Sequence, residues 1–338
     1  MSSALRTVIL FAYECAPYNR PESTAGAQRP AQFAKHLPAY GWRAIVICCD
    51  ARARGQARPE HLAELASDAR RRAREADAGL SVVVPTASLP WYGLVDRMWR
   101  AAARKGRACS LARKALTVAK FPTGDYSYPW QPVACAVARA VASEVSIDAC
   151  VGEHSPDAGL FLARWFSHEF SVPWVADFRD PILQPLTPMA RGIYRPIARR
   201  LVSTASATVT VSGAWSEMDR NLFEKPAHTI SNGFDADEFV ASERSSSGTF
   251  QIVYTGRVDA MQRMDTFLKG LRLAREQAGE GFDVSFVYRG YGAEAVARLA
   301  DDEGVADLVD VGSHVDRSEA LALMKGAHVL LLLSIRGD

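Results

Sequence analysis

The sequence predicts an α/β protein with two doubly wound parallel-sheet domains. Strand patterns alternate with helical patterns from Thr7 to Ile230, and the alternation restarts at Phe250, which is typical of parallel sheets with helices on both faces. Between them, Glu238–Thr249 is rich in serine and polar residues, as linkers are. The apolar run Val172–Phe178 breaks off at Arg179-Asp180-Pro181, as a buried parallel strand does when its carboxyl end opens into a cleft.

The first domain, expected over residues 1–240, begins with a βαβ unit. Its first strand is β-branched and aromatic, and the helix that follows has apolar residues at helical spacing and a closing Gly41. The strands expected in this domain are Thr7–Tyr13, Trp42–Cys49, Leu80–Val84, Ile147–Val151, Pro173–Phe178, Ala207–Val211 and His228–Ile230. The helices expected are Ala27–Tyr40, Leu94–Lys120, Pro132–Glu144, Ala158–Phe170, Met189–Ser203 and Ala214–Phe223.

A linker over residues 241–249 leads to a second domain over 250–338. Its expected strands are Phe250–Thr255, Phe282–Arg289, Val309–Val311 and His328–Leu333, and its expected helices are Met264–Glu276, Ala293–Glu303 and Ser318–Lys325. Doubly wound domains have five or six strands. We therefore expect this domain to be incomplete, as a fragment or as a part that another segment or a partner completes.

The composition is ordinary for a globular protein and says little about partners. Hydrophobic residues make up 48%, charged residues make up 23%, and the formal net charge is +2. The six cysteines form no CxxC pair and no Cys/His metal spacing, so we expect reduced core thiols in a cytoplasmic protein. The N-terminus has no secretory-signal pattern and no apolar segment reaches spanning length. We expect neither a metal nor a cofactor.

Two stretches are rich in arginine and lysine. Residues 91–114 interleave aromatic and basic side chains, a pattern that suits an anionic membrane surface and equally suits a solvated helix with a core-facing stripe. Arg52–Arg74 lacks aromatic residues and is expected to be a charged helix. No nucleic-acid-binding module accompanies the charge, so nucleic acid is not an expected partner.

Three candidate sites follow strands of the first domain. The loop Ser23–Arg29, with Gly26, is either an anion-binding loop before a helix or a plain βα turn. His154, beside Glu153, follows a strand and is either a ligand contact or a capped surface residue. Arg179-Asp180 is either an anion site or an internal salt bridge that pins its loop.

Further candidates surround the linker. Asn232-Gly233 predicts a tight turn at the end of the first domain. Gly256-Arg257 follows a strand of the second domain, Arg263 lies where the next helix begins, and Gly290 starts a second glycine turn. Two arginines beside a helix N-terminus suit a diphosphate, and the alternative is that both arginines are merely solvated.

Taken in order, these motifs resemble the family four glycosyltransferases, which are retaining nucleotide-sugar enzymes. The series is GAQR, EHSPDAG, WVADFRDP, VTVSGAWSE, TISNGFDADEF, IVYTGRVD, FVYRGYG and VGSHV followed by ALMKGAHVLLLL, and it runs essentially end to end. The resemblance implies the GT-B fold, in which two Rossmann-like domains face a cleft, here with the second incomplete. WVADFRDP resembles the subgroup often tied to capsular or exopolysaccharide assembly.

The resemblance also implies roles for single residues. His154 would be the catalytic-site histidine over the transferred sugar, and Arg257 would bind the donor diphosphate. The lysine that usually follows in that turn is replaced by Gln262, with Arg263 beside it. The remaining assignments are donor-binding for Gly26, Asn232, Gly233, Gly256, Arg263 and Gly290, and acceptor-side for Gln28, Arg29, Arg179 and Asp180.

The expected reaction is transfer of a sugar from a nucleotide-sugar to the hydroxyl of a saccharide or lipid-linked acceptor. The family's donor-site glutamate pair and its returning C-terminal helix would lie beyond Asp338, so a partner segment is expected to complete the site. The chain would work in the cytoplasm, and residues 91–114 would hold it on the inner membrane face. Two alternatives remain: an inactive scaffold that needs a partner, and a GT-B-like sugar-nucleotide epimerase.

Overall fold

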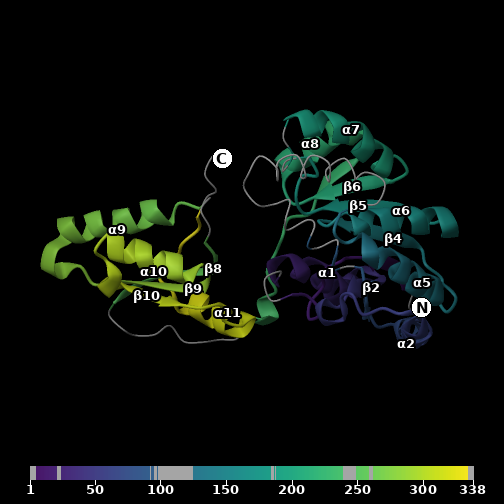
Figure 1. Ribbon diagram of the computed structural model, residues 1–338, viewed down its shortest axis with the longest axis horizontal. Coiled ribbons are helices and arrows are strands. Elements are labelled where there is room, and N and C mark those ends of the chain that lie inside the picture. Colours follow the sequence, from purple (N-terminus) through teal and green to yellow (C-terminus); the bar gives the residue numbers. More distant parts are fainter. Residues whose placement is uncertain are drawn as a thin grey trace. The chain divides into compact units, whose positions relative to one another are not determined.

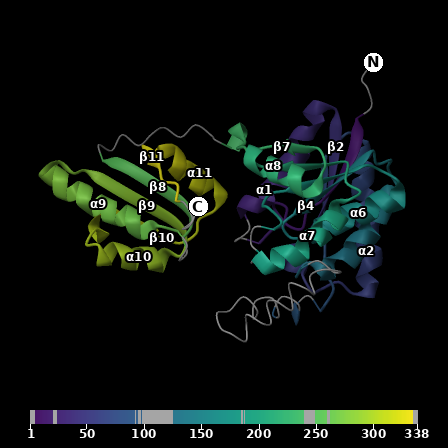
Figure 2. The same ribbon diagram turned by 90° about the horizontal axis from the view of Figure 1, so that it is seen from above.

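The computed structural model describes residues 5–20, 24–91, 93, 94, 97, 125–183, 186, 188–238, 249–258 and 262–333. The chain divides into two compact units, Met1–Gly233 and Phe234–Asp338, whose elements are labelled in Figures 1 and 2. The linker predicted over 241–249 and the helix predicted over Leu94–Lys120 lie almost wholly outside the described residues, as does most of the basic stretch 91–114.

The first unit is built on a seven-stranded parallel sheet in the order β3-β2-β1-β4-β5-β6-β7. The strands are β1 (Arg6–Phe11), β2 (Trp42–Cys49), β3 (Val82–Thr86), β4 (Ala149–His154), β5 (Trp174–Phe178), β6 (Ala207–Thr210) and β7 (Ala227–Thr229). The doubly wound sheet expected from the sequence is thus confirmed. The strand order reverses between β1 and β4, and open α/β sheets bind ligands at such a switch point.

Helices pack against both faces of this sheet because successive side chains of a strand point to opposite faces. Val8 and Leu10 of β1 lie in a cluster with side chains of α1, whereas Ile9 and Phe11 lie in a second cluster with α5 and α6. The helices of this unit are α1 (Thr24–His36), α2 (Pro59–Asp77), α5 (Gln131–Ala142), α6 (Ala158–Phe170), α7 (Pro188–Val202) and α8 (Gly213–Phe223), with short 3-10 turns η2 (Leu37–Tyr40), η3 (Ala51–Ala53) and η4 (Tyr128–Trp130).

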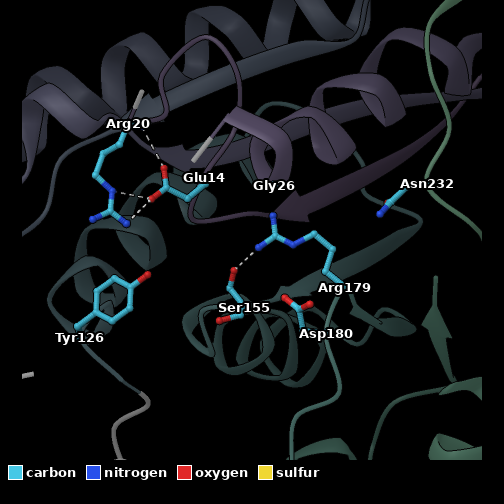
Figure 3. Close-up of a pocket in the computed structure, with 8 residues that line it drawn as sticks. All are labelled: Glu14, Arg20, Gly26, Tyr126, Ser155, Arg179, Asp180 and Asn232. Carbon is cyan, nitrogen blue, oxygen red and sulfur yellow. Dashed lines mark hydrogen bonds and ion pairs between the residues drawn. The ribbon is translucent and has the colours of Figure 1, made fainter. Parts of the chain in front are cut away.

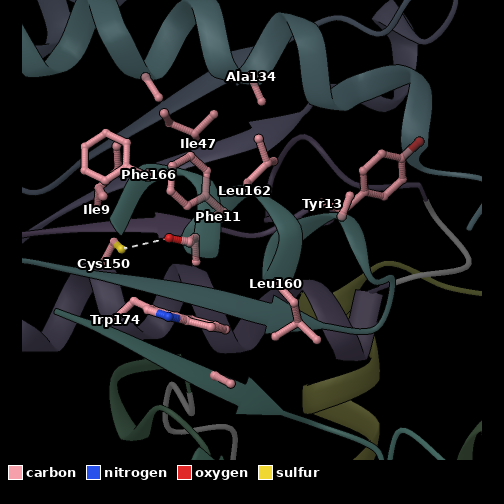
Figure 4. Close-up of a cluster of buried hydrophobic side chains, with 14 of the residues drawn as sticks. Ile9, Phe11, Tyr13, Ile47, Ala134, Cys150, Leu160, Leu162, Phe166 and Trp174 are labelled. Carbon is pink, nitrogen blue, oxygen red and sulfur yellow. Dashed lines mark hydrogen bonds between the residues drawn. The ribbon is translucent and has the colours of Figure 1, made fainter. Parts of the chain in front are cut away.

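The second of these clusters is the main core of the unit (Figure 4). The rings of Phe11 and Phe166 lie 5.7 Å apart, and Trp174 is fully buried beside them. The thiol of Cys150 donates to the carbonyl of Ala163 at 3.4 Å within this core. This packing fixes β1, β4 and β5 relative to one another, and these strands lead into the candidate site.

Two glycines let α6 approach the sheet closely. A Cβ at Gly159, in the first turn of α6, would lie 2.4 Å from the carbonyl oxygen of Glu153 and 2.5 Å from that of Phe11. A Cβ at Gly152 of β4 would lie 2.5 Å from the carbonyl oxygen of Gly159. Because these neighbours are backbone atoms that cannot turn aside, the close approach requires glycine at both positions.

The second unit contains a four-stranded parallel sheet in the order β10-β9-β8-β11. One face packs on α9 and α10, and the other packs on α11. The strands are β8 (Phe250–Arg257), β9 (Val284–Tyr291), β10 (Val309–Gly312) and β11 (Val329–Leu330); the helices are α9 (Met264–Ala278), α10 (Ala293–Asp302) and α11 (Arg317–Gly326), with 3-10 turns η5 (Ala236–Glu238), η6 (Gly279–Gly281) and η7 (Ala306–Leu308).

Most predicted elements are present, with shifted ends. The strand predicted to end at Val151 continues to His154, because β4 stays paired with β5 through His154 and Phe178. The strand predicted over His328–Leu333 is regular only at Val329 and Leu330, where it pairs with β8.

Several chemical features of the described residues accompany this fold. Cys15, Cys48, Cys49, Cys135 and Cys150 are free thiols. In the described ranges, no three His, Cys, Asp or Glu side chains gather as a metal site. Of the helices in the described part of the chain, none has both the length and the apolarity to cross a membrane.

The close packing of α6 predicts the effect of one added methyl group. Gly159→Ala should lower the free energy of unfolding by about 2–3 kcal/mol, because the new Cβ would overlap two backbone carbonyls. Urea denaturation followed by circular dichroism measures this. Gly192→Ala is the matched control, since Gly192 lies inside α7 with nothing within 4 Å of its Cβ position; it should leave stability unchanged or raise it by about 0.5–1 kcal/mol. Equal effects at both sites would contradict this packing.

Candidate functional site

A polar pocket of about 420 Å³ lies in the first unit at the carboxyl ends of its strands. It is lined by Glu14, Arg20, Gly26, Tyr126, Ser155, Arg179, Asp180 and Asn232 (Figure 3). Glu14 follows β1 and Ser155 follows β4, so the pocket lies at the point where the strand order reverses. The sheet topology therefore places these polar side chains where ligands of doubly wound sheets bind.

Gly26 lies in the first turns of α1 and not in the predicted loop, because the helix begins at Thr24. A Cβ at Gly26 would lie 2.1 Å from Nη1 of Arg179, so the arginine side chain packs directly on the glycine. Pro30, also inside α1, has no N–H to donate to the carbonyl of Gly26 four residues earlier. Glycine at position 26 thus leaves space for the guanidinium of Arg179. It is not needed there to form a turn, because Gly26 is helical.

Arg179 is held at the pocket by the strand end beside it. Its main-chain N–H donates to the carbonyl of His154 at 3.0 Å, and Nη2 donates to the carbonyl of Ser155 at 2.6 Å. Nη1 lies 3.8 Å from Oε1 of Glu153 and makes no hydrogen bond. Arg179 therefore forms a long ion pair with Glu153, which is an internal salt bridge of the kind considered from the sequence. Asp180 is exposed on the pocket wall.

Glu153 is a buried acid next to this arginine. It is only 6% exposed, and its Oε1 has no hydrogen-bond partner. Burial raises the pKa of Glu153 to about 8, while the guanidinium of Arg179 opposes that rise. At neutral pH the carboxyl group is therefore mostly protonated, and the charge of Arg179 is largely uncompensated from that side.

His154 lies beside a buried polar network, although its Nδ1 makes no hydrogen bond. Its Nδ1 lies 2.8 Å from Oδ1 of Asp157, and the hydroxyl of Tyr194 donates to Oδ2 of Asp157 at 2.8 Å. The main-chain N–H of Asp157 donates in turn to Asp125 at 3.2 Å. The histidine is 5% exposed and packs on Phe178. His154 does not itself line the pocket, whereas the next residue, Ser155, does.

Arg29 is buried, and its guanidinium is used within the protein. Nε and Nη2 donate to the two carboxylate oxygens of Asp177 at 2.8 and 2.9 Å. Nη1 donates to the carbonyl of Ile230 at 3.0 Å and to Oδ1 of Asn232 at 3.3 Å. The acceptor contact predicted for Arg29 is not favoured by this geometry, since all three nitrogens already have partners. Gln28, the other residue predicted to contact an acceptor, is half-buried on α1.

Asn232 reaches the pocket from the chain that follows β7. It lies in irregular backbone with Gly233, the last residue of the first unit, rather than in the predicted tight turn. The bond from Arg29 positions its side-chain amide at the pocket wall.

The opposite wall was not foreseen in the sequence. Glu14 accepts from Arg20 at 3.1 Å and from the buried Arg54 at 2.8 Å, and the Arg54 guanidinium lies 4.7 Å from the ring centroid of Tyr13. Tyr126 completes this wall. The available signal was the position of Glu14 after the first predicted strand, the same argument that singled out His154.

In the second unit, two paired glycines lie near the carboxyl ends of neighbouring strands. Gly256 of β8 and Gly290 of β9 face each other in register, and a Cβ at Gly290 would lie 1.6 Å from the carbonyl oxygen of Gly256. The hydroxyl of Tyr288 is within 3.1 Å of the same carbonyl. The prediction that both glycines follow their strands was wrong, because each strand ends two residues later than predicted, at Arg257 and Tyr291.

The two arginines of this edge differ in their surroundings. Arg257 is exposed at the end of β8, with its guanidinium 5.5 Å from the ring centroid of Tyr291. Arg263 caps the start of α9, and its side chain bonds to Asp265 at 3.2 Å and to Thr266 at 2.5 Å. Arg257 is thus the more available cation, and Arg263 is turned toward its own helix.

Comparison with known proteins places this architecture among solved structures. No protein-family model matches the chain, and no curated protein is significantly similar to it in sequence. The N-terminal domain of trehalose-6-phosphate phosphatase from Candida albicans superposes with a TM-score of 0.60 at 13% identity, covering 97% of this chain and 76% of that chain. HepE from Anabaena in complex with UDP gives 0.52 at 13% identity, covering 96% and 73%. A glycosyltransferase from Rickettsia africae gives 0.51 at 11% identity, covering 97% and 73%.

The chain has the GT-B fold. This confirms the fold class expected from the sequence, since the similarity extends over both parallel-sheet units. At identities of 11–13%, the similarity establishes the GT-B fold alone, and the reaction must be argued from the pocket.

The buried acid predicts a pH dependence of stability. Because the pKa of Glu153 is about 8 in the folded protein and 4.5 for an ordinary glutamate, its protonated form favours folding at low pH. The stabilisation of the folded state that the protonated form provides is lost as the pH rises from 4.5 to 8. Relative to Glu153→Gln, the wild type should lose about 1.4 kcal/mol per pH unit over this window and then level off.

Urea denaturation at several pH values measures this difference. Glu64→Gln, at an exposed position of α2, is the control and should give a nearly flat difference. A flat difference for Glu153→Gln as well would show that Glu153 ionises normally in the folded protein.

Proposed function

We propose that the protein is a retaining glycosyltransferase of the family four type, which moves a sugar from a nucleotide-sugar donor to an acceptor hydroxyl. The observation that carries this proposal is the pocket at the switch point of the first sheet, where Arg179 packs on Gly26 beside His154. The guanidinium of Arg179 at the pocket wall is a group that binds oxyanions through charge-assisted hydrogen bonds.

Structurally similar proteins support a nucleoside diphosphate as the ligand of this pocket. HepE of Anabaena has been solved with UDP, and another similar structure is a glycosyltransferase from Rickettsia africae. A nucleoside diphosphate would offer oxyanions to Arg179, which lines the pocket of the first unit. The proposed donor is therefore a nucleotide-sugar, and a UDP-sugar is the first to test.

In the proposed reaction, arginine charge stabilises the departing diphosphate as the bond to the sugar breaks. The acceptor hydroxyl attacks the oxocarbenium-like carbon and gives up its proton to the departing phosphate oxygen. His154, next to Ser155 of the pocket wall, would position the transferred sugar, and Asp180 and Gln28 would lie on the acceptor side. Arg29 would hold the site rather than touch an acceptor. We propose no metal or cofactor, and a saccharide or lipid-linked acceptor of polysaccharide or glycolipid assembly.

Binding of UDP by isothermal titration calorimetry tests the proposal. Arg179→Ala should weaken UDP binding by about 10- to 100-fold, because it removes a charge-assisted hydrogen bond to phosphate. Arg139→Ala is the control: Arg139 is an exposed arginine of α5 that pairs with Glu169, and its removal should not change the affinity. Absence of UDP binding by the wild type, or equal affinity in Arg179→Ala and Arg139→Ala, would refute the proposal.

Product analysis then separates transfer from epimerisation, the alternative that the sequence leaves open. A transferase should consume a UDP-sugar only when an acceptor saccharide is present. An epimerase should convert the UDP-sugar without an acceptor. Proton NMR of the anomeric signals distinguishes the two, and conversion without an acceptor would replace the transferase proposal.

A further inference from the structure

We propose that Arg179 and Glu153 form a proton-coupled clamp for an oxyanion, in which Arg179 binds the oxyanion from the pocket while Glu153, behind it, carries a proton. The clamp deepens the proposed function by making Glu153 a positioning residue for the anion-binding arginine. No motif of the sequence assigns this role to Glu153.

The geometry leaves one nitrogen of the guanidinium without a hydrogen-bond partner. Arg179 lines the pocket, and Nη2 is anchored to the carbonyl of Ser155 (Figure 3). Nη1 is buried without a hydrogen-bond partner, and so is Oε1 of Glu153 at 3.8 Å. Two buried polar atoms at this separation form a weak pair, and a small movement of the arginine toward the pocket can exchange Glu153 for an oxyanion.

The other charges near Glu153 are paired with one another. On β5, Asp177 faces Glu153 in register and is neutralised by Arg29 of α1. After β1, Glu14 is paired with Arg20 and Arg54. On the loop after β5, Asp180 is exposed to solvent, which screens it.

Arg179 is therefore the cation whose charge depends on the state of Glu153. With Glu153 ionised, the two side chains largely neutralise each other. With Glu153 protonated, Arg179 presents a full positive charge to the pocket. Burial favours the protonated form, with a pKa of about 8 in the protein without ligand.

Ligand binding and proton binding must then be coupled. An oxyanion at Arg179 adds negative charge close to Glu153 and competes for the same guanidinium, so it favours the protonated acid. When the carboxylate is ionised, binding takes up one proton from solvent to form the carboxylic acid. Affinity should be highest below about pH 8 and fall as pH rises above it, by about tenfold for a coupling of one pKa unit.

The experiment measures the affinity of the full chain for sulfate and for UDP between about pH 6.5 and 9.5. Sulfate does not titrate in this range, and dividing the wild-type affinity by that of Glu153→Gln at each pH cancels the titration of UDP. Glutamine mimics the protonated acid. The affinities should agree near pH 6.5, and the wild type should bind about tenfold more weakly near pH 9.5.

Asp219→Asn is the matched control. Asp219 is another buried acid, on α8, whose pKa burial raises to about 7, but it does not line the pocket. It should keep the wild-type pH profile for sulfate and UDP. Calorimetry in two buffers of different ionisation enthalpy should show proton uptake on binding near pH 8.5 in the wild type and none in Glu153→Gln.

The two ligands separate the clamp from the proposed function. UDP binding with the same pH profile in the wild type and in Glu153→Gln overturns the clamp and leaves the transferase proposal standing. Sulfate binding with the predicted profile, without any UDP binding, supports the clamp and refutes the transferase proposal. Failure to bind either anion, or loss of the pH profile in Asp219→Asn, overturns the clamp.

Discussion

The ion pair between Arg29 and Asp177 is the constraint on which the first unit's pocket depends. It joins α1 to β5 through two parallel hydrogen bonds of 2.8 and 2.9 Å, and the third nitrogen of Arg29 reaches Ile230 and Asn232 after β7. Three segments far apart in sequence are thus fixed to one guanidinium. A planar donor of this kind sets orientation as well as distance.

The rest of the site follows from where this pair holds α1. Because the helix is fixed there, Gly26 lies against Arg179, and Arg179 in turn lies against Glu153. Removing two charges from water costs free energy that offsets much of their mutual attraction. The ion pair therefore adds little to the net stability of the fold. Its main contribution is orientation: the pair fixes which faces of α1, β5 and the chain after β7 meet at the pocket.

The fold was predictable because buried parallel strands are apolar runs that end sharply, as Val172–Phe178 does, and because their carboxyl ends share one edge of the sheet. Gly26, Arg179, Asp180 and Asn232, which that argument singled out, line one pocket. Partnerships were not predictable: Arg29 and Asp177 are 148 residues apart, and Arg29 was expected to contact an acceptor. The raised pKa of Glu153 could not be predicted from the sequence either, because it depends on how completely the neighbouring elements exclude water from the carboxyl group.

The most direct test of this account is the UDP affinity and stability of Arg29→Met, Asp177→Leu and the double variant. Each single change leaves one buried charge without its partner and should destabilise the fold by about 3–5 kcal/mol. The double variant should recover most of that stability, because apolar side chains of similar size replace the pair. It should not recover UDP binding, because nothing then orients α1 and Asn232. Wild-type affinity in the stable double variant would contradict the claim that this ion pair builds the site.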